Sequence, residues 1–322
     1  MGSSLASDVS ICITTYSRQA ILQWHLQVLD RLGFGGQVVI SEGGPKPFRV
    51  PASLNLGFEV KSLHLPREEA ETAPENAARC MNAALTEATR PYFTMTCDDD
   101  LRVPLALREA QSMLHRDASI SAVLATRIYL KLEPVQRSEN RSEFRVRLPR
   151  THRFSLPYAK VSESKSLSDP DLVSRLGEFE QNRFHGMFAV MRTGDRPPES
   201  GGYRFQNPHC ASDYQWLFNP VFRGKTVSSN TVGTISLIHG KNLSFAENNP
   251  FRSDPATVED LRNFARLWDS CSVENIELVC DILNRFDSTS RRSGLLEEMV
   301  TSAKYFYVSR KWCSTLNRRE SQ

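Results

Sequence analysis

Apolar and polar residues alternate in blocks along the first part of the chain, and the blocks predict strands and helices in turn. The apolar, β-branched runs that predict strands lie at residues 9–16, 37–42, 58–65 and 92–97. Residues 20–34 and 74–90 carry apolar positions at the spacing of one helix face. Strands that alternate with helices predict an α/β fold with a mostly parallel, Rossmann-like central sheet flanked by helices.

The pattern changes after a predicted helix at residues 104–116 and a predicted strand at residues 120–130. Polar residues dominate from about residue 133 to residue 182, and six arginines fall within residues 137–153. The alternating segment EFRVRL in this region predicts a hairpin or a mobile insertion. Such a cluster binds acidic groups or forms a solvated loop.

Regular patterns return later in the chain and end in a helical region. A strand is predicted within RFHGMFAVMRT, a helix within DYQWLFNPVFRGK and a strand within TVGTISLIHG. From residue 254 onwards the apolar spacing is helical. We therefore expect one α/β domain at residues 8–250, with residues 133–182 as an Arg-rich insertion, and a C-terminal helical extension at residues 251–322.

Composition and charge exclude several classes of protein. The 322 residues are 40% hydrophobic and 24% charged, which is ordinary for a globular enzyme. No apolar stretch is long enough for a membrane span, and the N-terminus lacks the features of a signal peptide, so we expect a cytoplasmic protein. The net charge of +3 gives no reason to expect a nucleic-acid partner, and the seven cysteines show no metal-binding spacing, which predicts reduced thiols.

Three consecutive carboxylates, Asp98, Asp99 and Asp100, follow the predicted strand at residues 92–97. Ligands of open α/β sheets bind outside the carboxyl ends of the strands, so these side chains face the expected site. Their charge favours Mg²⁺ or Mn²⁺, which in turn bridges phosphates. The alternative is that Asp100 caps the helix that starts near Pro104.

Several separated segments resemble the nucleotide-sugar glycosyltransferases with a GT-A fold, especially those of family 2. The matching segments are VSICITTYSR, PENAARCMNAAL, TMTCDDDLRVP, HGMFAVMRT, ASDYQWLFNPVFRGK and SLIHGKNLS. They follow one another in the order of the family and cover about residues 8–246. One departure is Ser17, which stands where the family's first motif usually has Asn.

The resemblance implies a donor site at the ends of the first strands and in the helix at residues 74–90. Residues after the first strand would lie beside the nucleobase, Glu42 would accept a hydrogen bond from ribose or base, and Asp98 would hold the same part of the nucleotide. The residues that the resemblance places in the donor site are Thr14, Thr15, Tyr16, Arg18, Glu42, Asn76, Arg79, Asp98 and Asp99. Thr14, Thr15, Tyr16 and Glu42 are also of a type that closes turns.

The resemblance also implies a metal, a base and an acceptor side. Asp100 and His239 would bind Mn²⁺ or Mg²⁺, although a histidine at a strand end also bonds backbone carbonyls. Asp213 would be the general base of an inverting transfer, with Ser212 in place of the usual Glu; the alternative is a carboxylate that complements a helix dipole. His185 and Gly186 would lie on the acceptor side.

The expected function is transfer of a sugar from a nucleotide-diphosphate sugar, with a UDP-sugar as the expected donor, to a glycan or lipid-linked glycan in polysaccharide synthesis. The alternatives are a retaining, exostosin-like transferase and a non-catalytic sugar-binding scaffold. A nucleotidyltransferase is disfavoured because no Gly-rich loop follows the first strand. Aromatic and basic residues near the C-terminus predict peripheral contact with the inner face of a membrane, or packing of a helix on the domain.

Overall fold

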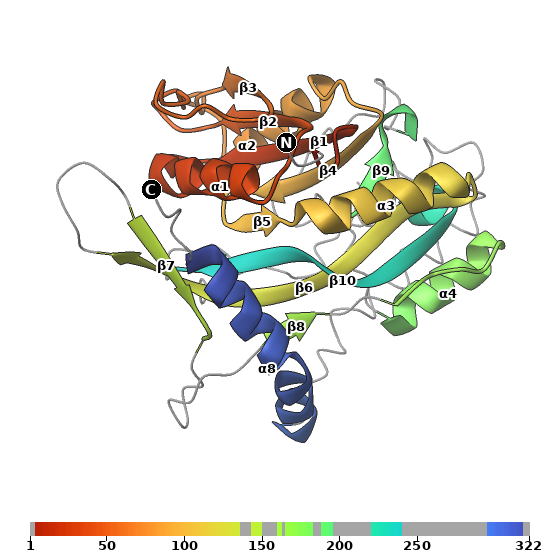
Figure 1. Cartoon of the computed structure of the whole chain (residues 1–322). Coiled ribbons are helices and arrows are strands. Elements are labelled where there is room, and N and C mark those ends of the chain that lie inside the picture. The colour runs from red at the N-terminus through yellow and green to blue at the C-terminus, as the bar shows by residue number, and fades with distance from the viewer. Residues whose placement is uncertain are drawn as a thin grey trace.

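The structure, a computed structural model, describes residues 4–135, 143–149, 160–162, 165–182, 188–195, 220–239 and 295–317. These residues form a ten-stranded sheet with helices packed against it (Figure 1). The mixed α/β architecture that the sequence predicts is confirmed.

The first part of the chain supplies four strands that pair in parallel and one short strand that pairs antiparallel with a later strand. Its strands are β1 (Val9–Thr15), β2 (Gln37–Glu42), β3 (Glu59–His64), β4 (Tyr92–Cys97) and the short β5 (Asp100–Arg102). Its helices are α1 (Gln19–Arg31), α2 (Ala73–Thr86) and α3 (Pro104–Arg116). The predicted segments 37–42, 92–97 and 104–116 match β2, β4 and α3 residue for residue.

The second part of the chain adds two long strands and several short elements. The strands are β6 (Ile120–Val135), β7 (Glu143–Arg147), β8 (Lys160–Ser162), β9 (Val190–Arg192) and β10 (Lys225–Ile238). The helices are α4 (Leu172–Asn182), the 3-10 helix η2 (Thr193–Asp195) and α8 (Leu295–Asn317). β7 pairs antiparallel with the end of β6, which confirms the predicted hairpin.

The order of the strands creates a reversal between β1 and β4. The sheet runs β3-β2-β1-β4-β9-β6-β10-β5, with β7 and β8 paired to β6. β1 is parallel to β2 and to β4, and β2 is parallel to β3. The chain therefore moves outwards from β1 to β3 and returns to the other side of β1. A reversal of this kind places a ligand site outside the carboxyl ends of the two central strands.

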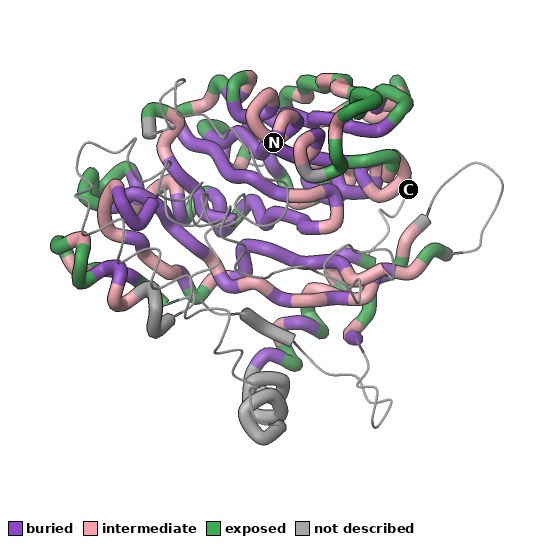
Figure 2. Tube along the Cα trace, turned by 180° about the vertical axis from the view of Figure 1, so that it is seen from behind, coloured by how far each residue is buried: buried purple, intermediate pink, exposed green. Residues whose placement is uncertain are grey.

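The core lies along the central strands, which are buried on both faces (Figure 2). Val9, Ile11 and Ile13 of β1 have no exposed surface, and the same holds for Leu22 and Leu26 of α1. Near-continuous apolar composition is typical of parallel strands that are covered by helices on both sides. This rigid layer fixes the positions of the loops that follow β1, β2 and β4.

Several predicted boundaries differ from the observed ones, and two of them have a clear structural cause. α1 ends at Arg31, three residues before the predicted end, because Gly33 adopts a left-handed conformation with φ of 77°. β6 continues to Val135 instead of ending near residue 130, because β7 pairs with its final residues. In both cases a local backbone feature or a pairing partner decides the boundary, and neither is visible as periodicity.

The C-terminal helix α8 packs on the outer strands and presents its other face to solvent. The side chain of Asn317 accepts from Val146 N–H at 3.0 Å and donates to Val146 O at 2.8 Å. Tyr305 and Leu316 are buried, whereas Tyr307 is 76% exposed. Within the described residues, no helix is long and apolar enough to cross a membrane. Residues 240–294 lie outside the described part, so the division into domains stays a prediction.

Candidate functional site

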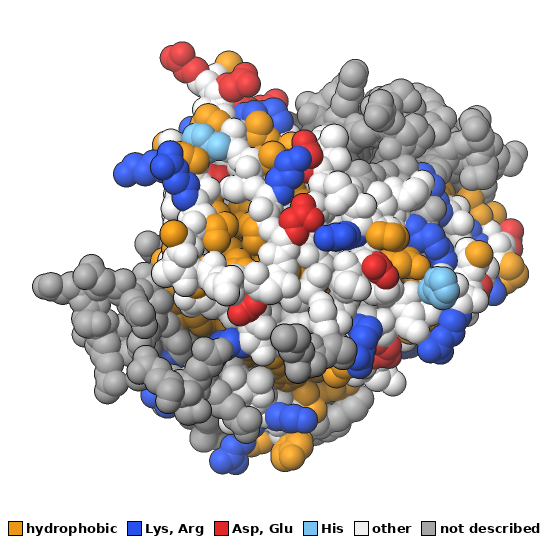
Figure 3. All heavy atoms as spheres, turned by 45° about the horizontal axis from the view of Figure 1, so that its top comes forward, with side chains coloured by type: hydrophobic (Ala, Val, Ile, Leu, Met, Phe, Trp, Pro, Cys, Tyr) orange, Lys and Arg blue, Asp and Glu red, His pale blue; other side chains and the backbone are white. Residues whose placement is uncertain are grey.

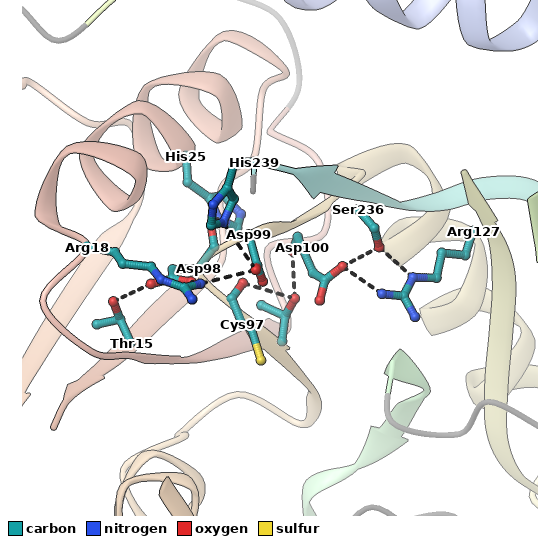
Figure 4. Close-up of polar contacts among 11 residues, drawn as sticks. Thr15, Arg18, His25, Cys97, Asp98, Asp99, Asp100, Arg127, Ser236 and His239 are labelled. Carbon is teal, nitrogen blue, oxygen red and sulfur yellow. Dashed lines mark hydrogen bonds and ion pairs between the residues drawn. The ribbon is translucent and has the colours of Figure 1, made fainter. Parts of the chain in front are cut away.

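The three aspartates lie in the turn between β4 and β5, outside the carboxyl end of β4 (Figure 4). Leu237 N–H donates to the backbone oxygen of Asp99 at 2.7 Å, and Thr96 Oγ1 donates to that of Asp100 at 2.6 Å. Asp100 is also the first residue of β5 and pairs with Ser236 of β10. The turn is therefore fixed by its neighbours on both sides.

Asp98 contacts the end of β1 through both carboxylate oxygens. Thr15 Oγ1 donates to Asp98 Oδ2 at 2.6 Å, and Arg18 Nη1 lies 3.0 Å from Asp98 Oδ1. The same Arg18 nitrogen lies 3.1 Å from Asp99 Oδ2. The two strands at the reversal are thus joined by a charged, largely buried hydrogen-bond network.

Asp100 contacts the part of the sheet that contains β6 and β10. Arg127 Nη2, from β6, lies 3.1 Å from Asp100 Oδ1. Ser236 Oγ donates to the same oxygen and accepts a hydrogen bond from Arg127 Nε. Because this carboxylate is engaged here, it does not cap α3; the N-cap of α3 is Val103, which makes no side-chain capping bond. The alternative role proposed for Asp100 from the sequence is therefore wrong.

Burial and neighbouring charges shift the three pKa values in different directions. Burial, opposed by Arg18 and reinforced by Asp99, raises the pKa of Asp98 to about 6. Burial also raises the pKa of Asp100, against the lowering effect of Arg127. For Asp99, burial acts upwards, but the contacts with His239 and Arg18 outweigh it and the pKa is lowered. Burial is the largest influence on all three carboxyls, and the neighbouring charges reverse the direction of the pKa shift only for Asp99.

His25 of α1 contacts the backbone of the aspartate turn. Its Nδ1 lies 3.2 Å from the backbone oxygen of Asp98, and burial lowers the pKa of His25 to about 4, against the effect of this contact. The ring is therefore neutral at pH 7. A carbonyl oxygen can only accept, so we assign the proton to Nδ1.

His239 lies directly after β10 and contacts the aspartate turn. Its Nε2 is 3.4 Å from Asp99 Oδ2. This places the histidine that the sequence singles out beside the acidic run, although the two are far apart in the chain (Figure 4).

Glu42, at the end of β2, braces the loop that follows β1. Its Oε1 accepts from Ser17 N–H at 2.9 Å and from Gly44 N–H at 2.7 Å. Ser17 has a φ of 56°, a left-handed conformation that is costly for a residue with a side chain. The other oxygen of Glu42, Oε2, is buried and has no hydrogen-bond partner among the described residues.

Asn76 and Arg79 lie on α2, which begins with a capping box between Thr72 and Glu75. Asn76 is buried and donates to the backbone oxygen of Leu65 at 2.9 Å. Arg79 forms two hydrogen bonds of 2.8 Å with Glu71. These bonds hold both side chains against the segment that leads from β3 to α2.

A shallow hollow opens beside the loop after β1. It is lined by Ser17, Gln19, Pro45, Lys46, Pro47 and Arg49. Lys46 and Arg49 are exposed, and Tyr16 of the same loop is 50% exposed. On the face shown in Figure 3, acidic and basic side chains are interspersed.

Comparison with known proteins relates this arrangement to one fold. No protein-family model and no curated protein matches the sequence. The crystal structure of S. aureus TarS superimposes with a TM-score of 0.51 at 15% identity, covering 88% of this chain and 44% of that one. Its 1–349 fragment gives 0.51 at 13% identity, covering 96% of this chain and 83% of the fragment. TarS is a GT-A-type glycosyltransferase.

This chain has the GT-A fold. It spans less than half of the full-length TarS chain, 44%. At these identities the likeness concerns the fold, and the expected GT-A architecture is confirmed. The roles expected for individual residues stay predictions.

The GT-A fold brings most of the predicted site residues to one edge of the sheet. Thr15, Arg18 and the aspartates meet directly, with His239 beside them. Thr14 is buried at the end of β1, and Glu42 lies at the end of β2. Asn76 and Arg79 bond to the segment after β3 instead of to the aspartates. Asp213, His185 and Gly186 lie outside the described residues.

The aspartate turn fits a divalent cation. Cys97 Sγ and one carboxylate oxygen each of Asp99 and Asp100 lie within 4.8 Å of one another. Carboxylates are ligands that suit Mn²⁺ and Mg²⁺, whereas a thiol is a softer donor.

The sequence analysis did not single out several residues of this network. They are His25, Cys97, Arg127 and Ser236. Two carried a visible signal: Arg127 is the sole charged residue of the run at 120–130, and His25 sits at helical spacing among apolar residues of α1. The other two look like ordinary strand residues in the sequence.

Proposed function

We propose that this protein transfers a sugar from a nucleoside-diphosphate sugar, with a UDP-sugar as the expected donor, to a hydroxyl group of a glycan or lipid-linked glycan. The observation that carries the proposal is the run of aspartates at the β1/β4 reversal of a GT-A fold, joined to the end of β1 through Thr15 and Arg18. A fold alone does not establish an activity, so the proposal rests on this site.

The buried oxygen of Glu42 supports a nucleotide in the site. Glu42 Oε2 is fully buried and lacks a partner among the residues that the structure describes. A buried acceptor without a hydrogen bond is costly, and a ribose hydroxyl or a base N–H would satisfy it. Tyr16 and Thr15 lie at the adjacent strand end, and the half-exposed Tyr16 ring offers a surface on which a base could stack.

Asp99 and Asp100, with Cys97, are the residues that would hold Mn²⁺ or Mg²⁺, and His239 is positioned beside Asp99. A bound divalent cation would neutralise charge on the departing diphosphate. Arg18 orients Asp98 and Asp99 through one nitrogen and keeps them fixed at the reversal. The chain thereby provides an oriented set of oxygens for a phosphorylated donor.

The transfer step needs a base for the acceptor hydroxyl, and we assign this role to Asp213. Asp213 would take the proton of the acceptor hydroxyl while the hydroxyl oxygen bonds to the anomeric carbon and the bond to the nucleoside diphosphate breaks on the opposite face, which inverts the configuration. The resemblance of ASDYQWLF to the catalytic helix of the family supports this assignment. Ser212 in place of the usual Glu keeps two alternatives open, namely a retaining transfer and a non-catalytic sugar-binding role.

Release of nucleoside diphosphate from a panel of UDP- and GDP-sugars with Mn²⁺, with water as acceptor, tests the proposal. We expect release by the wild type, loss in Asp100→Asn, and retained donor binding without release in Asp213→Asn. Asp117→Asn, at an exposed position after α3, is the matched control and should behave as wild type. Full release by Asp100→Asn would contradict the metal assignment. Donor binding without release in the wild type would favour the scaffold alternative.

A further inference from the structure

Arg127 occupies an unusual position for a charged residue. It lies in the middle of β6, a strand whose neighbours are mostly buried and apolar. Its side chain turns towards the aspartate turn, where Nη2 lies 3.1 Å from Asp100 Oδ1 and Nε donates to Ser236 Oγ (Figure 4). Because Ser236 donates to the same carboxylate oxygen, the three side chains form a closed network.

Two aromatic rings hold the guanidinium group in place. The Arg127 guanidinium carbon lies 4.5 Å from the centre of the Phe188 ring and 4.9 Å from that of Tyr129. Such stacking stabilises a cation that is partly removed from water. These ring contacts favour a position of Arg127 within the site independently of its contact with Asp100.

The position of Arg127 conflicts with metal binding at Asp100. Asp100 is 7% exposed and belongs to the donor group of Cys97 and Asp99. A divalent cation on this carboxylate would lie a few ångströms from the Arg127 charge, and two like charges at that distance in a partly buried site repel strongly. Either Asp100 binds the cation weakly, or Arg127 first leaves Asp100 for another anionic partner.

We propose that Arg127 controls the metal affinity of the site by an exchange of ion partners: it holds Asp100 until a phosphorylated donor provides anionic oxygens for its guanidinium group, and only then does the carboxylate become available to a divalent cation. This inference rests on the function proposed above. Arg127 is a positioning residue in this scheme, and the bidentate geometry of arginine suits both carboxylate and phosphate oxygens.

The scheme requires that metal and nucleotide bind cooperatively. Each ligand removes one partner of the Arg127–Asp100 ion pair and so lowers the cost of binding the other. Thermodynamic linkage makes the effect reciprocal: a nucleoside diphosphate tightens Mn²⁺ binding by the same factor by which Mn²⁺ tightens nucleotide binding.

Titration of free Mn²⁺, followed by electron paramagnetic resonance with and without UDP, tests the inference on the full chain. Arg127→Met keeps much of the side-chain volume and removes the charge. We expect it to bind Mn²⁺ alone at least about fivefold more tightly than the wild type, and to lose most of the enhancement by UDP. Arg116→Met, which removes an exposed arginine at the end of α3, is the control and should match the wild type.

Two further variants separate charge from packing. Arg127→Lys keeps the charge and should retain the weak Mn²⁺ affinity of the wild type. Ser236→Ala removes the hydroxyl that joins Arg127 to Asp100, so Mn²⁺ affinity should rise by a smaller factor. If thermal unfolding shows that Arg127→Met is not folded, the Mn²⁺ affinity of Ser236→Ala tests the inference in its place.

Unchanged or weaker Mn²⁺ binding in folded Arg127→Met, or unchanged binding in Ser236→Ala, overturns the inference. Absence of Mn²⁺ binding in every variant also overturns it. Tighter Mn²⁺ binding in Arg127→Met, together with no UDP binding by any variant, would support the competition for Asp100 while contradicting the transferase function. The two failures are therefore distinguishable.

Discussion

The titrations of His25 and Asp98, which contact each other through the Asp98 backbone, affect stability in opposite directions. Burial lowers the pKa of His25 from 6.5 to about 4, so its contribution is present above pH 6.5 and is lost as the pH falls through 4. Burial raises the pKa of Asp98 from 3.8 to about 6, so its contribution is present below pH 3.8 and is lost as the pH rises through 6. Between pH 4 and pH 6 the two offset each other.

Asp98→Asn should therefore lose stability more steeply than the wild type as the pH falls from about 6 to about 4, because Asn takes up no proton and the loss from His25 is no longer offset. Urea unfolding across this range measures the difference in the free energy of unfolding. Asp30→Asn is the control, since its Oδ1 can still accept from Gly57 N–H. An equal change in the free energy of unfolding with pH for Asp98→Asn and the wild type would contradict the opposed titrations of His25 and Asp98.

Glu42 braces the loop after β1 by accepting hydrogen bonds from the backbone of Ser17 and Gly44. A Cβ on Gly44 would lie 2.7 Å from Glu42 Oε1 and 2.9 Å from Ser17 N, closer than atoms pack. Gly44→Ala should thus destabilise the protein by about 1–3 kcal/mol and weaken UDP binding. In α4, where nothing lies within 4 Å of such a Cβ, Gly177→Ala should stabilise by up to about 1 kcal/mol. Chemical unfolding that ranks the two variants the other way would exclude this role of Glu42.

The sequence predicted those site residues whose signals are local. The aspartate run and the Thr15–Arg18 segment each end an obvious strand, so their approach follows from parallel pairing of β1 and β4. Arg127 and Ser236 reach Asp100 across 27 and 136 residues of chain, and only the pairing of β5, β6 and β10 brings them together. Such contacts depend on strand order, which periodicity does not encode.

At the level of the elements, one side chain of α8 hydrogen-bonds to the backbone of β7. Asn317 satisfies both backbone groups of Val146, as a neighbouring strand would. Asn317→Ala should lower the free energy of unfolding by about 2 kcal/mol, since each hydrogen bond contributes about 1 kcal/mol. It should also speed amide exchange at Val146. Ser314→Ala, at an exposed position of α8, should do neither; equal effects of the two variants would show that α8 docks by other contacts.

The exposed face of α8 predicts contact with an anionic membrane surface. Phe306 and Tyr307 are 38% and 76% exposed, and Arg310 and Lys311 follow them by one helical turn on the same face. We expect the protein to sediment with vesicles that contain anionic lipid more than with neutral vesicles. Lys311→Glu should reduce this binding, whereas Lys61→Glu, on β3, should not. Equal sedimentation with both vesicle types would refute the prediction.

The sequence missed the helix α4, which lies in the region predicted as a polar insertion, and it also missed two short strands. β5 and β8 contain three residues each, too few to show an alternation of apolar and polar positions. Both exist because a long strand offers free edge groups, β10 to β5 and β6 to β8. β5 also matters for the site, since it holds Asp100 opposite Ser236. Most long strands and helices were predictable from their own residues, whereas β5 and β8 depend on their partners.

At the scale of the whole molecule, the site lies where two parts of the sheet meet. The parallel strands β1 to β4 supply Thr15, Arg18 and the start of the aspartate turn, and the β6/β10/β5 part supplies Arg127 and Ser236. The net charge of +3 does not reveal this arrangement, because acidic and basic side chains of the chain nearly cancel in the sum. Function in this molecule depends on how these local charges are paired.

Thermal unfolding in the presence of UDP, GDP, CMP or dTDP, each with and without Mn²⁺, tests whether the site binds a nucleotide. A ligand that binds only the native state stabilises it by about 2.7 kcal/mol at 100 times its Kd. We expect a concentration-dependent rise in Tm with UDP that Mn²⁺ increases, and loss of the Mn²⁺ effect in Asp100→Asn. No shift with any of the nucleotides would contradict this expectation.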